Sequence, residues 1–458
     1  MSSAVDYARD HKDESLQDLI NLLEIPSIST LPENQPDMQR AAEWLADRLK
    51  LLGFESVAII PTAKHPVVYG QHLEAGPEAP TVLVYGHYDV QPADPEDLWE
   101  TPPFEPTKKG DNLYARGASD MKGQVVAHLK AVEAMLKTDG LPVNLKYMLE
   151  GEEEIGSPNL EAFLREHQDK LQADLCLNLD AGILAPDTPA ITYALRGLGY
   201  FEIRLQGAKT DLHSGRYGGV VDNPAQVMAH LIAGMKDSQG KIQLPGFYDD
   251  VRPLTEDERQ DLAKLPSDEA WWKEQAGTAV LFGEPEYTPT ERATARPTLD
   301  VNGLLSGFTG EGSKTVLPAR AMAKVSMRLV PDQRADKVEA SLRKYLEDHV
   351  PDTMQWELLS HSGAPPGIME RDSQAVQAAT KAFEAVWGNK PLFTREGGTV
   401  PVVGYVQDIL GLDSLLLGFG LPDDNLHAPN EKFHLPNFHR GIETYIHFNR
   451  ALAKGSTS

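Results

Sequence analysis

Four apolar, strand-like stretches of this chain are each followed by side chains that can bind a metal ion. The stretches and their followers are residues 81–86 with His87 and Asp89, residues 144–149 with Glu150, Glu152, Glu153 and Glu154, residues 173–179 with Asp180, and residues 414–420 with an acidic loop carrying His427. In open α/β sheets, ligands bind outside the carboxyl ends of the strands. We therefore expect these side chains to meet at one edge of a sheet, and such a set of imidazole and carboxylate groups favours a hydrolytic metalloenzyme.

The run of glutamates from Glu152 to Glu154 carries the strongest single signal. Adjacent carboxylates repel one another, so a cation or a bound proton must compensate their charge. Neighbouring glutamates also allow a division of labour, in which one binds a cation and the next deprotonates the water that the cation activates. A cation lowers the pKa of such a water from ~15.7 towards ~7. The alternative interpretation is a solvated acidic loop.

Two further motifs are weaker by themselves. His87 and Asp89 are two residues apart, and residues i and i+2 of an extended segment share a face. Asp89 can therefore orient an imidazole that binds metal, although His87 could equally be a core histidine. Asp120 follows Ser119 at the expected start of a helix, where either residue could serve as an N-cap instead of a ligand.

The surrounding pattern predicts two domains. Apolar residues at helical spacing predict helices near 15–24, 38–52, 120–137 and 375–387, and their alternation with strands indicates a mostly parallel sheet covered by helices. After Gly197, residues 200–205 and 323–329 alternate with period two, and helices are expected at 223–237 and 334–350. We expect an α/β catalytic domain formed by residues 1–197 and 365–458, with an inserted α+β lid or dimerisation domain at 198–364.

Composition excludes several classes of protein. The 458 residues carry a formal net charge of −25, which argues against nucleic acid and anionic membrane surfaces as partners. The single cysteine, Cys176, lies in an apolar run and is expected to be a core thiol. No stretch approaches the ~20 apolar residues that span a bilayer, and the first residues are polar. The sequence predicts a cytoplasmic protein.

Taken in order, the motifs resemble the aminoacylase/carnosinase family of dinuclear metallopeptidases over nearly the whole chain, and the carnosinase-like dipeptidases most closely. They are residues 86–92 (GHYDVQP), 116–123 (RGASDMKG), 152–157 (EEEIGS), Asp180, 211–215 (DLHSG), 314–316 (KTV), 328–331 (RLVP), 395–399 (REGGT) and 427–431 (HAPNE).

The resemblance implies a role for each matched residue at the metal site. His87 and Asp180 would bind one ion, Glu154 and His427 a second, and Asp120 would bridge them. Zn²⁺ suits this nitrogen and oxygen ligand set best, and Mn²⁺ or Co²⁺ would also fit. Asp89 would orient a ligand and Glu153 would be the general base. The pair Glu153/Glu154 is preferred to Glu152/Glu153 because of its spacing to Gly156.

The resemblance also implies roles within the inserted domain and beside it. His213 would reach across a homodimer interface to stabilise the oxyanion. Arg328, Thr315 and His361 would hold the terminal carboxylate of a small peptide. Gly397, Gly398 and Thr399 would line the cleft.

The predicted function is metal-dependent hydrolysis of dipeptides with a free carboxy terminus, a carboxypeptidase-like reaction with Glu153 as base. The alternative within the enzymes is an N-acyl amino acid deacylase of the acetylornithine or succinyl-diaminopimelate type, because the same metal core serves both reactions. The alternative outside the enzymes is a metal-binding protein without activity. The presence of Glu153 beside a full set of ligands argues against that alternative.

Overall fold

The computed structural model describes residues 3–455, which form two compact units. Within these residues, unit 1 comprises 3–193, 368–394 and 405–455, and unit 2 comprises 194–367 and 395–404. The chain passes between the units at 193/194 and 367/368, where the sequence analysis expected domain limits at 197/198 and 364/365. The segment 395–404 also falls within unit 2.

Hydrogen bonds explain why the segment 395–404 belongs to unit 2. The Arg395 guanidinium donates to the buried Glu258 carboxylate at 2.8 Å. Arg196 Nε donates to the Gly397 carbonyl at 2.9 Å, and Arg328 Nη1 donates to Thr399 Oγ1 at 2.7 Å. No local pattern in the sequence reports such contacts, because each joins residues at least 70 positions apart.

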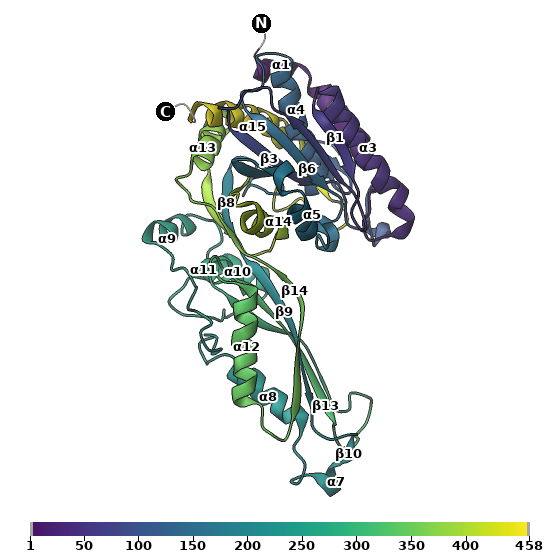
Figure 1. The fold of residues 1–458 in the computed structure, drawn as a ribbon, viewed down its shortest axis with the longest axis vertical. Helices are drawn as coiled ribbons and strands as arrows, with labels where there is room; N and C mark the ends of the chain where they lie inside the picture. Colours follow the sequence, from purple (N-terminus) through teal and green to yellow (C-terminus); the bar gives the residue numbers. More distant parts are fainter. Residues whose placement is uncertain (1–2, 456–458) are drawn as a thin grey trace. The chain divides into compact units, whose positions relative to one another are not determined.

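The unit 1 sheet contains the strands that the sequence predicted before each candidate ligand (Figure 1). Its order within the described residues is β1-β2-β6-β3-β7-β17-β8-β15, with β16 paired to β8. The strands are β1 (Glu55–Ile60), β2 (Val67–His72), β3 (Thr81–His87), β6 (Asn144–Glu150), β7 (Leu175–Asn178), β8 (Ala190–Leu195), β15 (Gly367–Ile368), β16 (Leu392–Glu396) and β17 (Ser414–Leu416).

The four central strands β6, β3, β7 and β17 are parallel to their neighbours within this group. Their side chains are buried on both faces, so they read as continuous apolar runs rather than alternating ones. The predicted mostly parallel, covered sheet is confirmed. The flanking strands β1, β2 and β8 pair in antiparallel fashion and were not predicted.

Helices cover this sheet, and most were predicted to within a few residues. In Figure 1, α3 runs along β1, while α4 and α15 lie close together. The helices of unit 1 are α1 (Ala4–Asp10), α2 (Lys12–Leu23), α3 (Gln35–Leu51), α4 (Gly123–Leu136), α5 (Leu160–Glu166), α6 (Gln168–Leu171), α13 (Gln374–Trp387) and α15 (Leu435–Gly455), and α14 (Pro401–Tyr405) crosses the boundary. The long helix α15 was not predicted. No helix among residues 3–455 is both long and apolar enough to cross a bilayer.

A small sheet in unit 1 joins segments far apart in sequence. Its order is β18-β5-β4, made of β18 (Lys432–His434), β5 (Asn112–Tyr114) and β4 (Thr107–Lys109). The pairing of β18 with β5 is antiparallel, with Lys432 opposite Tyr114. It fixes the end of the loop that carries His427 beside the segment that leads to Asp120.

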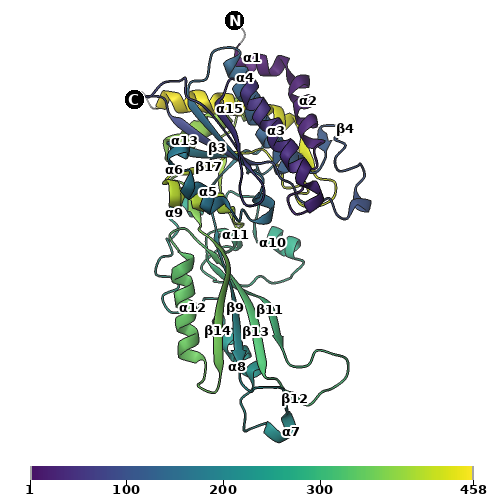
Figure 2. The same cartoon turned by 45° about the vertical axis from the view of Figure 1, so that its right-hand side comes forward.

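Unit 2 is the predicted α+β domain, a four-stranded antiparallel sheet with order β11-β13-β9-β14 (Figure 2). Its strands are β9 (Gly197–Gln206), β11 (Thr298–Ser306), β13 (Arg320–Leu329) and β14 (Gln355–Ala364), with a separate pair of β10 (Leu212–His213) and β12 (Val316–Leu317). Its helices are α7 (Ser214–Tyr217), α8 (Pro224–Gly234), α9 (Glu256–Leu262), α10 (Glu269–Ala276), α11 (Pro289–Thr294) and α12 (Ala335–His349).

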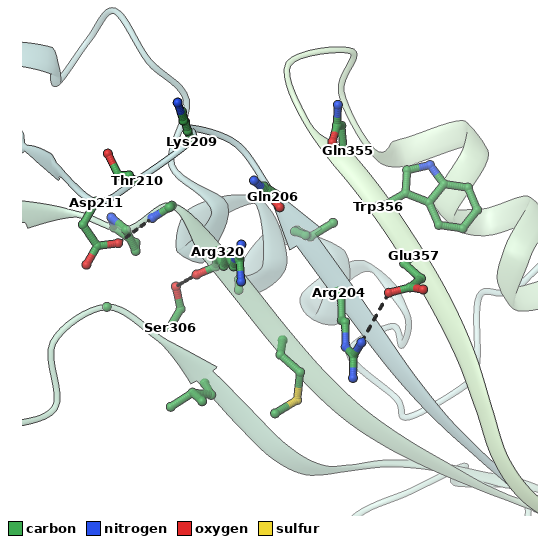
Figure 3. A pocket seen from close by; sticks show the side chains of 17 residues that line it. Arg204, Gln206, Lys209, Thr210, Asp211, Ser306, Arg320, Gln355, Trp356 and Glu357 are labelled. Atoms are coloured by element: carbon green, nitrogen blue, oxygen red, sulfur yellow. Dashed lines mark hydrogen bonds and ion pairs between the residues drawn. The ribbon is translucent and has the colours of Figure 1, made fainter.

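The two faces of this sheet differ as the period-two pattern predicts. Phe201, Ile203 and Leu205 of β9 are buried in a core that α8 and α12 complete. The alternate residues face outward and form an open groove lined by Arg204, Gln206 and Arg320 among others (Figure 3). The edge strand β11 was not predicted, because a bulge between Val301 and Gly303 interrupts its alternation.

His128 in α4 gives unit 1 a predictable response to acid. It is fully buried, its Nδ1 lies 2.6 Å from the Tyr147 hydroxyl, and burial lowers its pKa to about 3. The unfolded chain binds this proton below the ordinary pKa of 6.5, whereas the folded chain does not. The contribution to stability is therefore present above pH 6.5 and is lost as pH falls towards 3.

We expect the free energy of unfolding of the chelated protein to fall by about 1.4 kcal/mol per pH unit more than that of His128→Gln between pH 6 and 4. Urea unfolding at several pH values measures this difference. His230→Gln, at an exposed site on α8, is the control and should keep the slope of the unchanged protein. An equal slope in His128→Gln and the unchanged protein would contradict the assignment.

Candidate metal centre

His87 is the last residue of β3 and lies fully buried at the carboxyl edge of the parallel strands, opposite Glu150 of β6. Its Nδ1 is 3.0 Å from the carbonyl oxygen of Asp89. A proton on Nδ1 satisfies that contact and leaves Nε2 to face the Asp120 carboxylate, 3.1 Å away. The ring therefore directs Nε2 at the Asp120 carboxylate, an orientation that metal binding would require.

Asp120 lies between two histidines that are 340 residues apart in the sequence. Its Oδ1 is 3.1 Å from His87 Nε2, and its Oδ2 is 3.0 Å from His427 Nε2. The backbone at Asp120 is not helical (φ −115°, ψ 96°), and α4 begins only at Gly123, without a side-chain cap. The N-cap interpretation of Asp120 is therefore wrong, and both carboxylate oxygens are directed at imidazoles.

Glu154 joins the same cluster. Its Oε2 lies 3.1 Å from His427 Nε2 and accepts a hydrogen bond from Gln91 Nε2 at 2.8 Å. Among the described residues, ligand atoms of His87, Asp120 and Glu154 all lie within 4.8 Å of one another. Such a group of nitrogen and oxygen donors can hold a metal ion.

Glu152 is held in a different environment. Its carboxylate contacts the Thr62 hydroxyl, the backbone N–H of His65 at 2.9 Å and Asn159 Nδ2 at 2.7 Å. These three groups donate hydrogen bonds to the buried Glu152 carboxylate, so Glu152 stabilises its own loop. This arrangement supports the choice of Glu153 and Glu154 over Glu152 and Glu153.

Asp89 is buried and connects β3 to the glutamate loop. Its Oδ1 accepts from the backbone N–H of Glu153 at 3.2 Å, and its Oδ2 accepts from that of Glu154 at 3.0 Å. Its Oδ1 is also 3.4 Å from His87 Nδ1. The Asp89 carboxylate thus fixes the backbone of both glutamates and lies beside the His87 imidazole, whose Nδ1 is nearer to the Asp89 carbonyl oxygen.

Electrostatics show how much negative charge this edge of the sheet concentrates. Burial, reinforced by neighbouring carboxylates, raises the pKa of Asp180 to about 7 and that of Glu153 well above its ordinary value. Hydrogen bonds with Asp120 and Glu154 raise the pKa of His427 to about 10. Burial opposes the ionisation of Asp120, but hydrogen bonds from His427 and His87 outweigh it and lower its pKa.

The raised pKa values of Asp180, Glu153 and His427 have one physical meaning, which is that these groups hold protons because the cluster lacks positive charge. A divalent cation meets the same need, and imidazole and carboxylate donors suit Zn²⁺, Mn²⁺ or Co²⁺. Asp180 follows β7, and its carboxylate interacts electrostatically with Asp120, His87 and Glu154. The residues therefore fit the metal ions that the sequence suggested.

The candidate substrate residues of unit 2 fall into two groups. His213 is exposed at the end of β10 and pairs with Val316 of β12, which follows Thr315. The second group contains Arg328, near the carboxyl end of β13, and Thr399, whose hydroxyl oxygen accepts a hydrogen bond from the Arg328 guanidinium. Gly397 and Gly398 lie beside that group, and the backbone N–H of Gly397 donates to Glu396 Oε1 at 3.0 Å.

His361 on β14 is exposed, and its Nε2 lies 3.2 Å from Glu202 Oε2. Glu202 also pairs with Arg204 at 2.6 Å. His361 belongs to a polar cluster on the open face of the sheet. The pairing of β14 and β13 with β9 places His361 nearer to the end of the sheet that carries Arg328 than to the end near His213.

Two residues at the site were quoted in sequence motifs but given no role. Gln91 holds Glu154, and the buried carboxylate of Glu431 accepts from the backbone N–H of Asp120 at 3.1 Å. The clue to their role in the sequence is their position close to a candidate site residue: Gln91 stands two residues after Asp89, and Glu431 stands four residues after His427. Residue type alone could not distinguish them from surface groups.

Comparison with known proteins gives a consistent result. The model of Peptidase family M20/M25/M40 matches residues 83–451. The Cys-Gly metallodipeptidase DUG1 of Candida albicans is 33% identical and covers 97% of this chain and 96% of its own. The human Beta-Ala-His dipeptidase is 32% identical, over 97% of this chain and 91% of its own length.

Among solved structures, the M20 family metallo-carboxypeptidase Sso-CP2 from Sulfolobus solfataricus has a TM-score of 0.83 at 36% identity and covers 96% of this chain and 99% of its own. The match to the family model spans β3 to α15 and so includes every candidate ligand. Fold, ligand cluster and full-length similarity agree, and the chain belongs to the M20/M25/M40 family of metallopeptidases.

Proposed function

We propose that this protein is a dinuclear metallodipeptidase that hydrolyses dipeptides with a free carboxy terminus. The observation that carries the proposal is the Asp120 carboxylate, with one oxygen directed at His87 and the other at His427. A carboxylate arranged in this way suits a bridge between two ions. The names of the full-length relatives, Cys-Gly metallodipeptidase and Beta-Ala-His dipeptidase, favour dipeptides as substrates.

We assign His87 and Asp180 to one ion, Glu154 and His427 to the other, and Asp120 to both. Zn²⁺ is the best match, with Mn²⁺ and Co²⁺ as alternatives. When bound, divalent ions supply Lewis acidity, which polarises a scissile carbonyl and makes water more acidic. The chain's own contribution is to hold these donors in a fixed geometry through Asp89 and Gln91.

Glu153 is the proposed general base. Its backbone is held by Asp89, and its carboxyl has a pKa raised by burial, as suits a group that must accept a proton near neutral pH. It takes a proton from the attacking water and then donates a proton to the leaving amine. The same residue thus acts first as base and then as acid, and ends the cycle in its starting state.

Arg328 is the proposed anchor for the substrate carboxylate, because a guanidinium can bind both oxygens of a carboxylate. Thr399 already accepts from Arg328, and Gly397 and Gly398 lie next to it in sequence. We propose that these residues line the substrate cleft and that His361 and Thr315 contribute further polar contacts. The proposed role of His213 is to stabilise the oxyanion.

Distances within unit 2 support the proposal of a homodimer. Arg320 and Arg328 are eight residues apart on β13, which is about 27 Å along a strand. The pair of β10 and β12, which contains His213, lies beyond the Arg320 end of β13; Figure 1 shows β10 there beside α7. An extended dipeptide spans only about 7 Å, so one chain cannot bring both His213 and Arg328 to the same substrate. We propose that a second copy supplies His213.

Mixing two inactive variants tests this arrangement. His213→Ala and Glu153→Gln should each be nearly inactive, but dissociation and reassociation of an equal mixture should restore activity. Half of the dimers are then mixed, and each contains one complete site of two, so about a quarter of the unchanged activity is expected. A mixture no more active than its components would contradict the contribution of His213 from a partner.

Substrate class is tested by chelating the protein, restoring Zn²⁺ or Mn²⁺, and measuring hydrolysis of a dipeptide panel beside N-acetyl- and N-succinyl-amino acids. We expect metal-dependent cleavage of dipeptides, and loss of that cleavage when the substrate carboxylate is amidated. Cleavage of the acyl amino acids alone would overturn the dipeptidase proposal while leaving the metal site intact.

A further inference from the structure

Among the proposed ligands, His427 is the one whose side chain is held least by packing. It lies in an irregular loop between β17 and β18, and its side chain is 54% exposed. The backbone has positive φ at His427 (60°) and also at Asn425 and Asn430, which bends the loop sharply. Packing of the imidazole cannot fix its place, so other residues must hold the loop against Asp120.

Glu431, four residues after His427, is fully buried and reaches the segment that carries Asp120. Its Oε2 accepts from Arg116 Nη1 at 2.7 Å and from the Gly117 N–H at 2.9 Å. Its Oε1 accepts from the N–H groups of Ser119 at 3.0 Å and Asp120 at 3.1 Å. Both oxygens of one carboxylate are therefore used to hold residues 116–120.

Asp424, three residues before His427, is also fully buried and binds the same segment. Its Oδ2 accepts from the Ser119 hydroxyl at 2.7 Å and from the Leu421 N–H at 2.7 Å. Its Oδ1 accepts from Lys432 Nζ at 2.9 Å. The two acids thus join both ends of the His427 loop to residues 116–120, which are about 300 positions earlier in the chain.

Arg116 completes the connection. Besides its ion pair with Glu431, its Nη2 donates to the carbonyl of Ala428 at 3.2 Å and to that of Pro92 at 3.1 Å. Ala428 is the neighbour of His427. The guanidinium is 1% exposed, so water does not compete for these contacts.

We propose that Asp424 and Glu431 are positioning residues that clamp the His427 loop onto the Asp120 segment and so set the distance between these two side chains. The inference rests on the proposed function in one respect, which is that His427 and Asp120 are taken as ligands. The clamp itself is a property of the chain without metal. Removing a buried acceptor leaves several donors unpaired at once, which favours opening of the loop.

Hydrogen exchange of the metal-free protein tests the clamp directly. In Asp424→Asn and Glu431→Gln we expect backbone amides in both 421–432 and 115–123 to exchange at least about ten-fold faster. The two segments protect each other from solvent, so opening of the clamp exposes both. Asp423→Asn is the matched control: Asp423 pairs with the same Lys432 at 3.2 Å, but its side chain is 76% exposed. Faster exchange in 421–432 alone, or none, would overturn the proposal.

If either variant fails to fold, Ser119→Ala replaces it. That change removes one hydroxyl donor to Asp424 and leaves the backbone contacts of Glu431 in place. We expect faster exchange in the same two segments, smaller than in Asp424→Asn. Exchange equal to that of the unchanged protein would contradict a role for Asp424 in joining them.

Titration with Co²⁺ tests the consequence for metal binding. In Asp424→Asn we expect one of two binding events to weaken by about ten-fold or more, with a changed Co²⁺ absorption spectrum, while the other stays within about two-fold. Equal weakening of both events, or of neither, would overturn the positioning role. If the unchanged protein binds no Co²⁺, the proposed metal site fails, and hydrogen exchange still decides the clamp.

Discussion

Replacing Glu153 by glutamine should lower kcat for dipeptide hydrolysis by about 10³-fold while leaving two metal ions bound. The amide keeps the shape of the side chain but cannot accept the proton of the attacking water. Burial raises the pKa of the Glu153 carboxyl, so a neutral amide at this position should not destabilise the fold. Initial rates and metal analysis of the purified variant measure both effects.

Glu152→Gln is the informative comparison for this result. Glu152 is one residue earlier, but its carboxylate is occupied by the Thr62 hydroxyl, His65 N–H and Asn159. We expect Glu152→Gln to lower thermal stability and to change kcat far less than Glu153→Gln. Loss of turnover in Glu152→Gln with full activity in Glu153→Gln would show that the assignment of the base is wrong by one residue.

Replacing Asp120 by asparagine should have the second large effect, a loss of bound metal. Both carboxylate oxygens face an imidazole, at 3.1 Å from His87 and 3.0 Å from His427. An amide offers one oxygen, and its NH₂ group must face the other histidine. We expect fewer than one ion per chain at micromolar metal and a fall in kcat/KM of roughly 10³-fold, equal to about 4 kcal/mol of transition-state stabilisation.

Metal content by elemental analysis and activity after chelation and metal restoration measure this effect. Asp97→Asn is the control, because Asp97 is an exposed carboxylate in the loop after β3. It should retain full metal content and activity. Two firmly bound ions in Asp120→Asn would contradict a bridging role, whatever its activity.

The sequence predicted the framework of the site because that framework depends on local patterns. Continuous apolar runs predicted β3, β6 and β7, and the residues that follow them, His87, the glutamate loop and Asp180, lie at one edge of the sheet. Helical periodicity predicted α3, α8, α12 and α13 to within a few residues. Patterns failed at β11, where a bulge breaks the alternation, and at the antiparallel strands β1, β2 and β8.

The amino-acid sequence by itself determined which residue types reach the edge of the sheet, because hydrophobic periodicity and strand ends are local properties. Only the tertiary structure decided that Glu154 faces His427 while Glu152 turns to Thr62, and that Asp120 leaves the helix to face two imidazoles. It alone joined Glu431 and Asp424 to residues 116–120. The physical reason is that buried carboxylates take whichever donors the docked segments bring to them, and segments 300 residues apart leave no local trace of that choice.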